Sequence, residues 1–306
     1  MKNLKKILIP TDFSRCAQQA LPQALYLAEK YQAELHQLHA IVLHAEDPHN
    51  PAFHFPNLEE IHSRLKELAS QKMLAELEAQ QANLPTIQSV QMRGITAAAV
   101  ILEYAQDNDI DLIVMGTHGR RGLEHLLLGS VAEEVIRLAS CPVLTIREKK
   151  QAMPVEALKK ILVPLDFSEY SQRALSYAKE IAIVFSARLQ LLHVIEETIH
   201  PSFYASGINS IFKLMPDIKA KTTTAMQNLL KETAGPPVEA DFNILEGRAA
   251  RDIVQFAEEN SSDLIVIATH GLTGIEHFLL GSVAEKVVRR APCPVFTVKA
   301  FGKSLI

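Results

Sequence analysis

Two blocks of this sequence occur twice, in the same order and at nearly the same spacing. Lys6–Ser14 returns as Lys160–Ser168 with seven of nine residues identical, at an offset of 154 positions. Thr117–Ile146 returns as Thr269–Val298 with twenty of thirty residues identical, at an offset of 152. Because chance does not produce two such matches in order, each half is predicted to be one complete copy of the same domain.

The repeat divides the 306 residues into a first domain at 1–147, a linker at 148–156 and a second domain at 157–306. The linker is charged, contains Pro154 and has no apolar periodicity, as exposed interdomain segments do. Two domains also suit the length, since one hydrophobic core rarely serves more than about 250–300 residues.

Within each half, short β-branched runs alternate with longer segments whose apolar residues recur every three or four positions. The first half has strand candidates at 7–9, 35–43, 87–92, 112–115 and 143–146, and helix candidates at 14–30, 58–81, 97–107 and 130–139. The second half has strand candidates at 161–163, 189–195, 240–245, 264–267 and 295–298. Each half is therefore expected to be a doubly wound α/β domain, Rossmann-like or flavodoxin-like, with five parallel strands and four helices. Pro22 is expected to kink the first helix without ending it.

Composition excludes several classes of protein. No run of eighteen uncharged apolar residues argues for a membrane span, and no low-complexity tract indicates disorder. The apolar stretch 7–9 is too short for a signal peptide, and three cysteines form no disulfide framework, so a cytoplasmic location is expected. With a formal net charge of −4, any anionic ligand must be held by local geometry rather than by an overall field, and no nucleic-acid or membrane partner is expected.

The segment 116–130 has the pattern of a phosphate cradle. Gly116, Gly119 and Gly129 follow an apolar strand and precede a helix that starts near Ser130. Glycines permit close approach of the backbone, and a helix start presents unpaired N–H groups to an anion. A purely structural alternative stays open, because Ser130 with Glu133 three residues later has the spacing of a capping box and the glycines can serve only as turns. Asp12, at the end of the first strand, adds a second polar group where open α/β sheets bind ligands.

Taken together, these motifs resemble the universal stress protein family, nucleotide-binding type. The resemblance rests on a strand ending in PTDFS, a strand ending in LHA or LHV, the block DLIVMGTHG, nine further residues before GS, and a final strand after CPV. It spans both halves and implies the tandem form of the family. It also implies a sheet in the order 3-2-1-4-5, with ATP, accompanied by Mg²⁺, bound across the first and fourth strands of each domain.

Carried over residue by residue, the resemblance places adenosine against Asp12 and the backbone near Ala40, with Met115 and Gly116 beside the ribose. The phosphates lie against Gly119, Gly129, Ser130 and Val131. Arg120 and Arg121 follow Gly119 and either add positive charge to the triphosphate site or are simply solvated.

The second half carries the same pattern with changes. The corresponding residues are Asp166, Val194, Ile267, Ala268, Gly271, Gly281, Ser282 and Val283. Ala268 replaces the first glycine, which is harmless at negative φ and weakens binding if the turn needs positive φ or close approach. Leu272 and Thr273 replace the two arginines. Both halves are expected to bind nucleotide, the first more tightly.

The histidines and cysteines raise two further questions, metal binding and oxidation. His36, His39, His44, His49, His54 and His62 crowd one region, but strand alternation sends His36 and His39 to opposite faces, and no metal site is expected. His118 and His270, inside the glycine motif, are expected to orient the loop or face solvent. Cys141 and Cys293 are interpreted as small buried residues, and Cys16 as a candidate for oxidation only if exposed.

We expect an ATP-binding stress-response regulator in which occupancy alters conformation or partner binding, with no catalytic residue assigned. A slow ATPase or autophosphorylating enzyme and a nucleotide-free interaction module are the alternatives; a Walker A lysine motif and a kinase-type HRD and DFG set are absent. The apolar final strands are edges in the implied order, so the halves are expected to cover each other as a pseudo-dimer, with homodimerisation of the chain as a further step. The aromatic segment 201–217 is core, a lid or a partner surface.

Overall fold

The computed structural model describes residues 4–42, 58–80, 86–119, 128–148, 158–196, 209–271, 280–299 and 305. The chain divides into two compact units, residues 2–155 (the first unit) and residues 156–306 (the second unit). Each unit is described by itself. No helix within the described ranges combines the length and the apolar character that crossing a bilayer requires.

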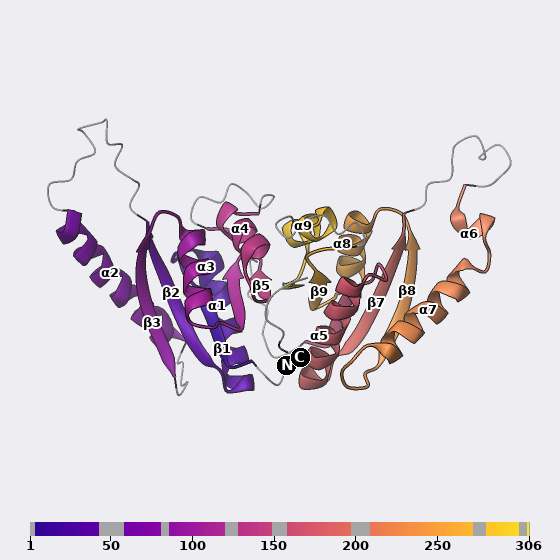
Figure 1. Ribbon diagram of the computed structural model, residues 1–306, viewed down its shortest axis with the longest axis horizontal. Helices are drawn as coiled ribbons and strands as arrows, with labels where there is room; N and C mark the ends of the chain where they lie inside the picture. The colour runs from indigo at the N-terminus through magenta and orange to yellow at the C-terminus, as the bar shows by residue number, and fades with distance from the viewer. Residues whose placement is uncertain are drawn as a thin grey trace. The chain divides into compact units, whose positions relative to one another are not determined.

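The first unit is a parallel five-stranded sheet with helices between successive strands (Figure 1). Its elements are β1 (Lys6–Pro10), α1 (Arg15–Tyr31), β2 (Glu34–Val42), α2 (Leu58–Ala79), β3 (Ile87–Gly94), α3 (Ala97–Asp107), β4 (Leu112–Gly116), α4 (Ser130–Leu138) and β5 (Val143–Ile146). The strand order is β3-β2-β1-β4-β5, and every pair is parallel. The doubly wound fold and the order 3-2-1-4-5 are therefore confirmed.

The second unit repeats this arrangement. Its elements are β6 (Lys160–Pro164), α5 (Glu169–Phe185), β7 (Arg188–Ile195), α6 (Ile211–Leu214), α7 (Ile218–Glu232), β8 (Ala240–Glu246), α8 (Ala249–Glu259), β9 (Leu264–Ala268), α9 (Ser282–Arg290) and β10 (Val295–Val298). The strand order is β8-β7-β6-β9-β10, again all parallel. The four-residue helix α6 is additional to the four helices that the repeat predicts for each half.

Side-chain contacts of β2 show which helices cover which face of the first sheet. His36 faces α3, where its Nδ1 lies 2.7 Å from the Tyr104 hydroxyl, whereas Gln37 faces α2, where its amide donates to Glu76 at 3.2 Å. Gln18 of α1 also donates to Glu76, so α1 lies on the same face as α2. Strands β1, β4 and β5 are mostly buried, because helices cover both faces of the parallel sheet, whereas the edge strand β3 has no buried residue.

The first helix forms as its sequence predicts. The Ser14 hydroxyl accepts the N–H of Ala17 as an N-cap, and the helix continues through Pro22 to Tyr31. Gln32 then ends it in the left-handed conformation. The prediction that Pro22 does not end the helix is confirmed.

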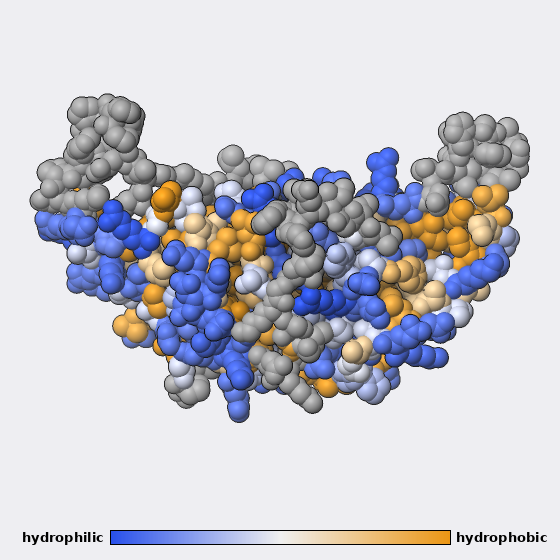
Figure 2. Space-filling view, in the orientation of Figure 1, coloured by the Kyte–Doolittle hydropathy of each residue, from blue (hydrophilic) through white to orange (hydrophobic). Residues whose placement is uncertain are grey.

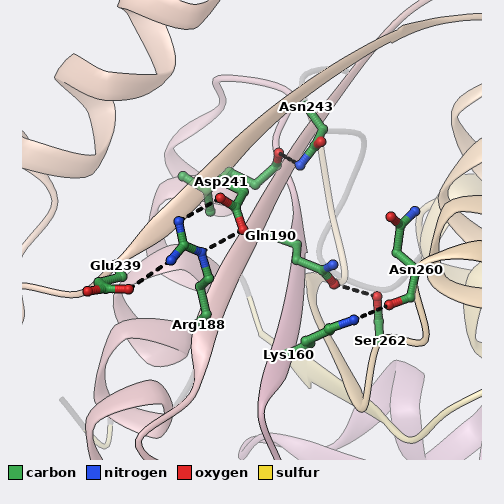
Figure 3. A network of polar contacts seen from close by, with 9 residues as sticks. Lys160, Arg188, Gln190, Glu239, Asp241, Asn243, Asn260 and Ser262 are labelled. Atoms are coloured by element: carbon green, nitrogen blue, oxygen red, sulfur yellow. Dashed lines mark hydrogen bonds and ion pairs between the residues drawn. The ribbon is translucent and has the colours of Figure 1, made fainter.

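Charged residues tie the edge strand of the second sheet to its neighbour (Figure 3). Arg188, at the start of β7, donates from Nε and Nη2 to both carboxylate oxygens of Asp241 and from Nη1 to Glu239. Beside them the buried Ser262 hydroxyl donates to Gln190 at 2.7 Å. This network lies at the amino ends of the strands, whereas the glycine motif lies at their carboxyl ends.

The aromatic segment 201–217 falls partly outside the described residues, which exclude Phe203, Tyr204 and Ile208. Of the described part, Ile211 is buried, whereas Leu214 and Met215 are exposed. Figure 2 shows apolar surface in the part of the view where Figure 1 draws α6. The described part of the segment, 209–217, therefore contributes one apolar side chain to the core and exposes two others.

Candidate functional site

The turn after β1 holds Asp12 at the carboxyl end of the sheet. Phe13 has a φ of 64°, in the left-handed region that residues other than glycine rarely adopt. Its N–H donates to the Thr11 hydroxyl at 3.1 Å, and the N–H of Ser14 donates to Asp12 Oδ1 at 3.0 Å. These bonds form a tight turn that fixes the backbone on both sides of Asp12.

The glycine motif lies directly against this carboxylate. A Cβ placed on Gly119 would lie 2.6 Å from Asp12 Oδ2, a separation that real side chains do not reach. The N–H of Gly129 donates to the Thr117 carbonyl at 2.8 Å, so the two ends of the motif meet. A Cβ on Gly129 would lie 3.1 Å from the same carbonyl. Both glycines therefore allow a close approach, of Gly119 to the Asp12 carboxylate and of Gly129 to the Thr117 carbonyl, and neither has a positive φ.

Helix α4 begins one residue earlier than a capping box at Ser130 requires. Gly129 is the N-cap, with φ −64° and ψ 141°, and Ser130 is the first helical residue. No side chain accepts a hydrogen bond at this cap. The capping-box interpretation is therefore wrong, because extended Gly129 takes the cap position and Ser130 is drawn into the first turn. A helix start without a side-chain acceptor offers its N–H groups and dipole to an anion.

One cleft of about 920 Å³ joins these features in the first unit. It is lined by every described residue of the first half that the sequence assigns to the site: Asp12, Ala40, Met115, Gly116, Gly119, Gly129, Ser130 and Val131. Arg120 and Arg121 lie outside the described residues. A volume of this size suits a cofactor-sized ligand.

The cleft has a wall that sequence reasoning missed. Leu65, Leu68, Ala69 and Lys72 of α2 line it, at the spacing of one helix face. Lys72 Nζ lies 5.4 Å from the centre of the Phe13 ring, which itself lies 4.6 Å from the ring of His39. The helical spacing was visible in the sequence, but nothing in it indicated that this face of α2 borders the site.

Gly116 packs against α1. A Cβ there would lie 2.8 Å from Cys16 Sγ, and the Cys16 thiol donates to the Ile146 carbonyl at 3.3 Å. Cys16, Cys141 and Cys293 are all buried. The oxidation role considered for an exposed Cys16 therefore has no support, and the interpretation of Cys141 and Cys293 as buried residues is confirmed.

The histidines do not form a metal site in the described residues. His36 and His39 lie on opposite faces of β2, as strand alternation predicts; His39 Nδ1 lies 2.8 Å from the Thr11 carbonyl. Among the described residues, no three His, Cys, Asp or Glu side chains are placed to hold a metal ion. His44, His49 and His54 lie outside them. His118 Nδ1 lies 2.8 Å from the Thr117 hydroxyl, and His270 Nδ1 lies 3.1 Å from that of Thr269, so both contact the loop.

The second unit has the same backbone frame. Phe167 has a φ of 63°, the N–H of Ser168 donates to Asp166 at 3.0 Å, and a Cβ on Gly271 would lie 2.6 Å from Asp166 Oδ2. Gly281 caps α9 ahead of Ser282 and Val283, again without a side-chain bond. Val194 lies in β7 beside Ile195, and Ile267 and Ala268 end β9.

Ala268 does not need the backbone freedom of glycine. Neither Ala268 nor Gly116 has a positive φ, so a methyl group is compatible with the turn. The surroundings of Ala268 also differ, because Tyr170 of α5 stands where the first unit has Cys16, and the Tyr170 ring lies 6.0 Å from that of His270. Other changes alter the surroundings: Leu165 replaces Thr11, and Glu196 replaces Val42 and accepts the N–H of Ala249 at 2.6 Å.

These observations define a tandem pair of doubly wound α/β domains, each with a glycine-lined carboxyl edge. The model of the universal stress protein family matches residues 3–147 and again residues 157–299. The chain therefore belongs to the universal stress protein family, and in tandem form.

Individual relatives agree with this assignment. A universal stress protein of Methanocaldococcus jannaschii, MJ0531, is 37% identical over 141 residues, which are 46% of this chain and 82% of that protein. Slr1230 of Synechocystis is 26% identical over 317 residues, covering 97% of this chain and all of that protein. The crystal structure of a universal stress protein from Archaeoglobus fulgidus matches with a TM-score of 0.68 and 23% identity, over 96% of this chain and 98% of that one, which supports the fold.

Proposed function

We propose that this protein is a cytoplasmic, ATP-binding stress-response regulator whose first-unit cleft holds the nucleotide. The observation that carries the proposal is the meeting of two complementary groups in one cleft. The Asp12 carboxylate accepts hydrogen bonds, as ribose hydroxyls require, and the α4 start with its glycine-lined approach donates them, as phosphates require.

In this proposal each described residue has a role. Asp12 binds the ribose, the backbone of Ala40 meets the adenine, and Met115 and Gly116 lie beside the ribose. The phosphates contact the N–H groups of the motif and of the helix start: Gly119, Gly129, Ser130 and Val131. The residues fit such a ligand because a side chain at Gly119 would press on the Asp12 carboxylate, and one at Gly129 would press on the Thr117 carbonyl, within the loop that lines the cleft.

Mg²⁺ enters the proposal with the triphosphate. The described residues offer no cluster of three metal ligands, so the ion would be held chiefly by phosphate oxygens and water, as Mg²⁺ commonly is. Bound Mg²⁺ would supply charge neutralisation of the phosphates.

The second unit is proposed to bind nucleotide more weakly. Its frame is the same, but Leu165 removes a hydroxyl from the turn and Glu196 brings a carboxylate to the end of β7, close to the edge where the first unit has Val42. A carboxylate near a polyanionic ligand is unfavourable. In both units, occupancy is proposed to alter the surface presented to a partner protein. Pairing of the halves as a pseudo-dimer and homodimerisation are parts of the same proposal.

The test is to denature freshly purified, undialysed full-length protein and identify the released nucleotide by chromatography. We expect ATP from wild type and from Gly271→Val, and little from Gly119→Val. Circular dichroism of all three proteins controls for folding. Release of no nucleotide, together with no binding of added Mg-ATP, would favour an interaction module that binds no nucleotide.

A further inference from the structure

A polar cluster lies between α2 and the turn that carries Asp12. The Glu76 carboxylate accepts hydrogen bonds from the Thr11 hydroxyl at 3.4 Å, from the Gln37 amide at 3.2 Å and from the Gln18 amide at 3.4 Å. These donors come from the end of β1, from β2 and from α1. One side chain of α2 therefore connects to three other elements of the first unit.

The second unit has leucine at three of these four positions. Leu165 follows Pro164 as Thr11 follows Pro10, and Leu191 pairs with Val163 as Gln37 pairs with Ile9. Met73 and Met226 are both fully buried and precede the first paired residue of their edge strands, Ile87 and Ala240, by the same number of residues. When these methionines are aligned, Leu229 is the residue of the second unit that corresponds to Glu76.

This comparison shows that the fold does not need the polar cluster. Gln37 and Leu191 are both completely buried, so the same interior position accepts either side chain. The turn also forms without the cluster, since Phe167 has nearly the φ of Phe13. Replacing all partners of a polar cluster by apolar side chains of similar shape can be nearly neutral or stabilising, so stability alone does not require this cluster.

The cluster does contact the proposed nucleotide site. Thr11, which donates to Glu76, lines the cleft and also accepts the N–H of Phe13, next to Asp12. Lys72, one helical turn before Glu76, lines the cleft from α2. Glu76 thus joins the α2 wall to the turn that carries Asp12.

All three partners of Glu76 donate, so the ionised carboxylate, which only accepts, satisfies the cluster best. Burial raises the pKa of Glu76 above its usual range, the bonds from Gln18 and Thr11 oppose this shift, and the Asp12 charge adds to it. The charged groups that face Glu76 are Asp12, on the turn after β1, and Lys72, on α2 itself. β2 and α1 present uncharged Gln37 and Gln18, with His39 farther along β2 at the Thr11 carbonyl.

We propose that Glu76 is a positioning residue of the first cleft: its ionised carboxylate holds the α2 wall against the Asp12 turn, and nucleotide binding in this unit is linked to a proton that the second unit does not exchange. The inference rests on the proposed nucleotide site. Acidification protonates Glu76, weakens the tie between α2 and the turn, and lowers affinity in the first unit.

The test compares wild type with Glu76→Gln in the full chain, with Mg-ATP affinity measured by calorimetry from about pH 5.5 to about pH 7.5. Any change of the ligand with pH is common to both proteins, so the difference between their profiles isolates Glu76. We expect Glu76→Gln to bind about tenfold more weakly at neutral pH, and wild-type affinity to approach that of the variant as the pH falls. Parallel profiles would overturn the proposal.

Two further measurements separate positioning from folding and from the proposed function. A triple variant, Thr11→Leu, Gln37→Leu and Glu76→Leu, carries the leucines of the second unit; we expect it to unfold at the wild-type temperature or above and to lose the pH linkage. Hydrogen exchange without nucleotide compares peptide 7–18 with peptide 161–172, which contains the equivalent turn. We expect Glu76→Gln to accelerate exchange in the first peptide only. Equal exchange would refute the proposal even if ATP binds, whereas accelerated exchange without ATP binding would refute the proposed function alone.

Discussion

The contact between Gly119 and Asp12 provides the sharpest test of the site. In Gly119→Ala the new Cβ would start 2.6 Å from Asp12 Oδ2, and ordinary contact begins at 3.4 Å, so the carboxylate must move by about 0.8 Å. Only the end of a side chain has to move, and Gly119 has no positive φ, so we expect the free energy of unfolding to fall by less than about 1 kcal/mol.

Binding should respond far more than stability. A carboxylate displaced by this distance loses a charge-assisted hydrogen bond to the ribose, which is worth about 1.5–3 kcal/mol. The dissociation constant for Mg-ATP should therefore rise about tenfold to a hundredfold. Calorimetric titration of the full chain measures this constant, and chemical unfolding measures stability.

The second unit supplies the matched control. Gly271→Ala creates the same 2.6 Å approach to Asp166 Oδ2. We expect this variant to keep the tight binding step of wild type. The reasoning is refuted if Gly119→Ala titrates like wild type, or if Gly271→Ala abolishes the tight step instead.

Three further predictions concern the rest of the chain. Burial lowers the pKa of His36 below 6.5, and Lys6 adds to this while Glu34 opposes it, so the folded state binds this proton less readily than the unfolded state. The contribution of neutral His36 to the free energy of unfolding is present above about pH 6.5 and is lost as the pH falls below it. His36→Gln introduces the residue that the second unit has at this position, Gln190, and should reduce this loss of stability in thermal unfolding. A pH profile of the variant that matches wild type would count against the argument. Tyr177→Phe removes the bond that the Leu305 N–H donates to the Tyr177 hydroxyl at 2.9 Å, which should cost about 0.5–1.5 kcal/mol in urea unfolding; no change would mean that this bond does not contribute. Arg188→Ala should lower the thermal midpoint only slightly and only at low salt, because its ion pairs with Asp241 and Glu239 are exposed; a large loss at high salt would contradict this.

The parallel sheet was predictable because its strands carry strong local signals. Buried runs such as 112–115 are uniformly apolar, and the internal repeat provides a second copy of each pattern. The strand order came from the family resemblance and not from the residues. Helix α6 was not predicted, because the aromatic segment 201–217 that contains it has no clear periodicity.

Part of the lining of the first cleft was predictable: Asp12, the glycines and Ser130 follow from strand ends and the glycine motif, and Ala40, Met115 and Val131 came from the family resemblance. The exact start of α4 was not, because serine and glycine both suit an N-cap and only the backbone angles of Gly129 decide between them. The α2 wall and Glu76 were missed for a different reason. Their partners, Thr11 and Gln37, are distant in sequence, and only tertiary packing brings them to the helix.

The central claim is tested most directly by a crystal structure of the full chain with Mg²⁺ and a non-hydrolysable ATP analogue. We predict phosphates at the N–H groups of residues 129–131 and the ribose against Asp12 in the first unit. Nucleotide bound elsewhere, or a first cleft that stays empty at saturating analogue while the crystals remain intact, would contradict the account.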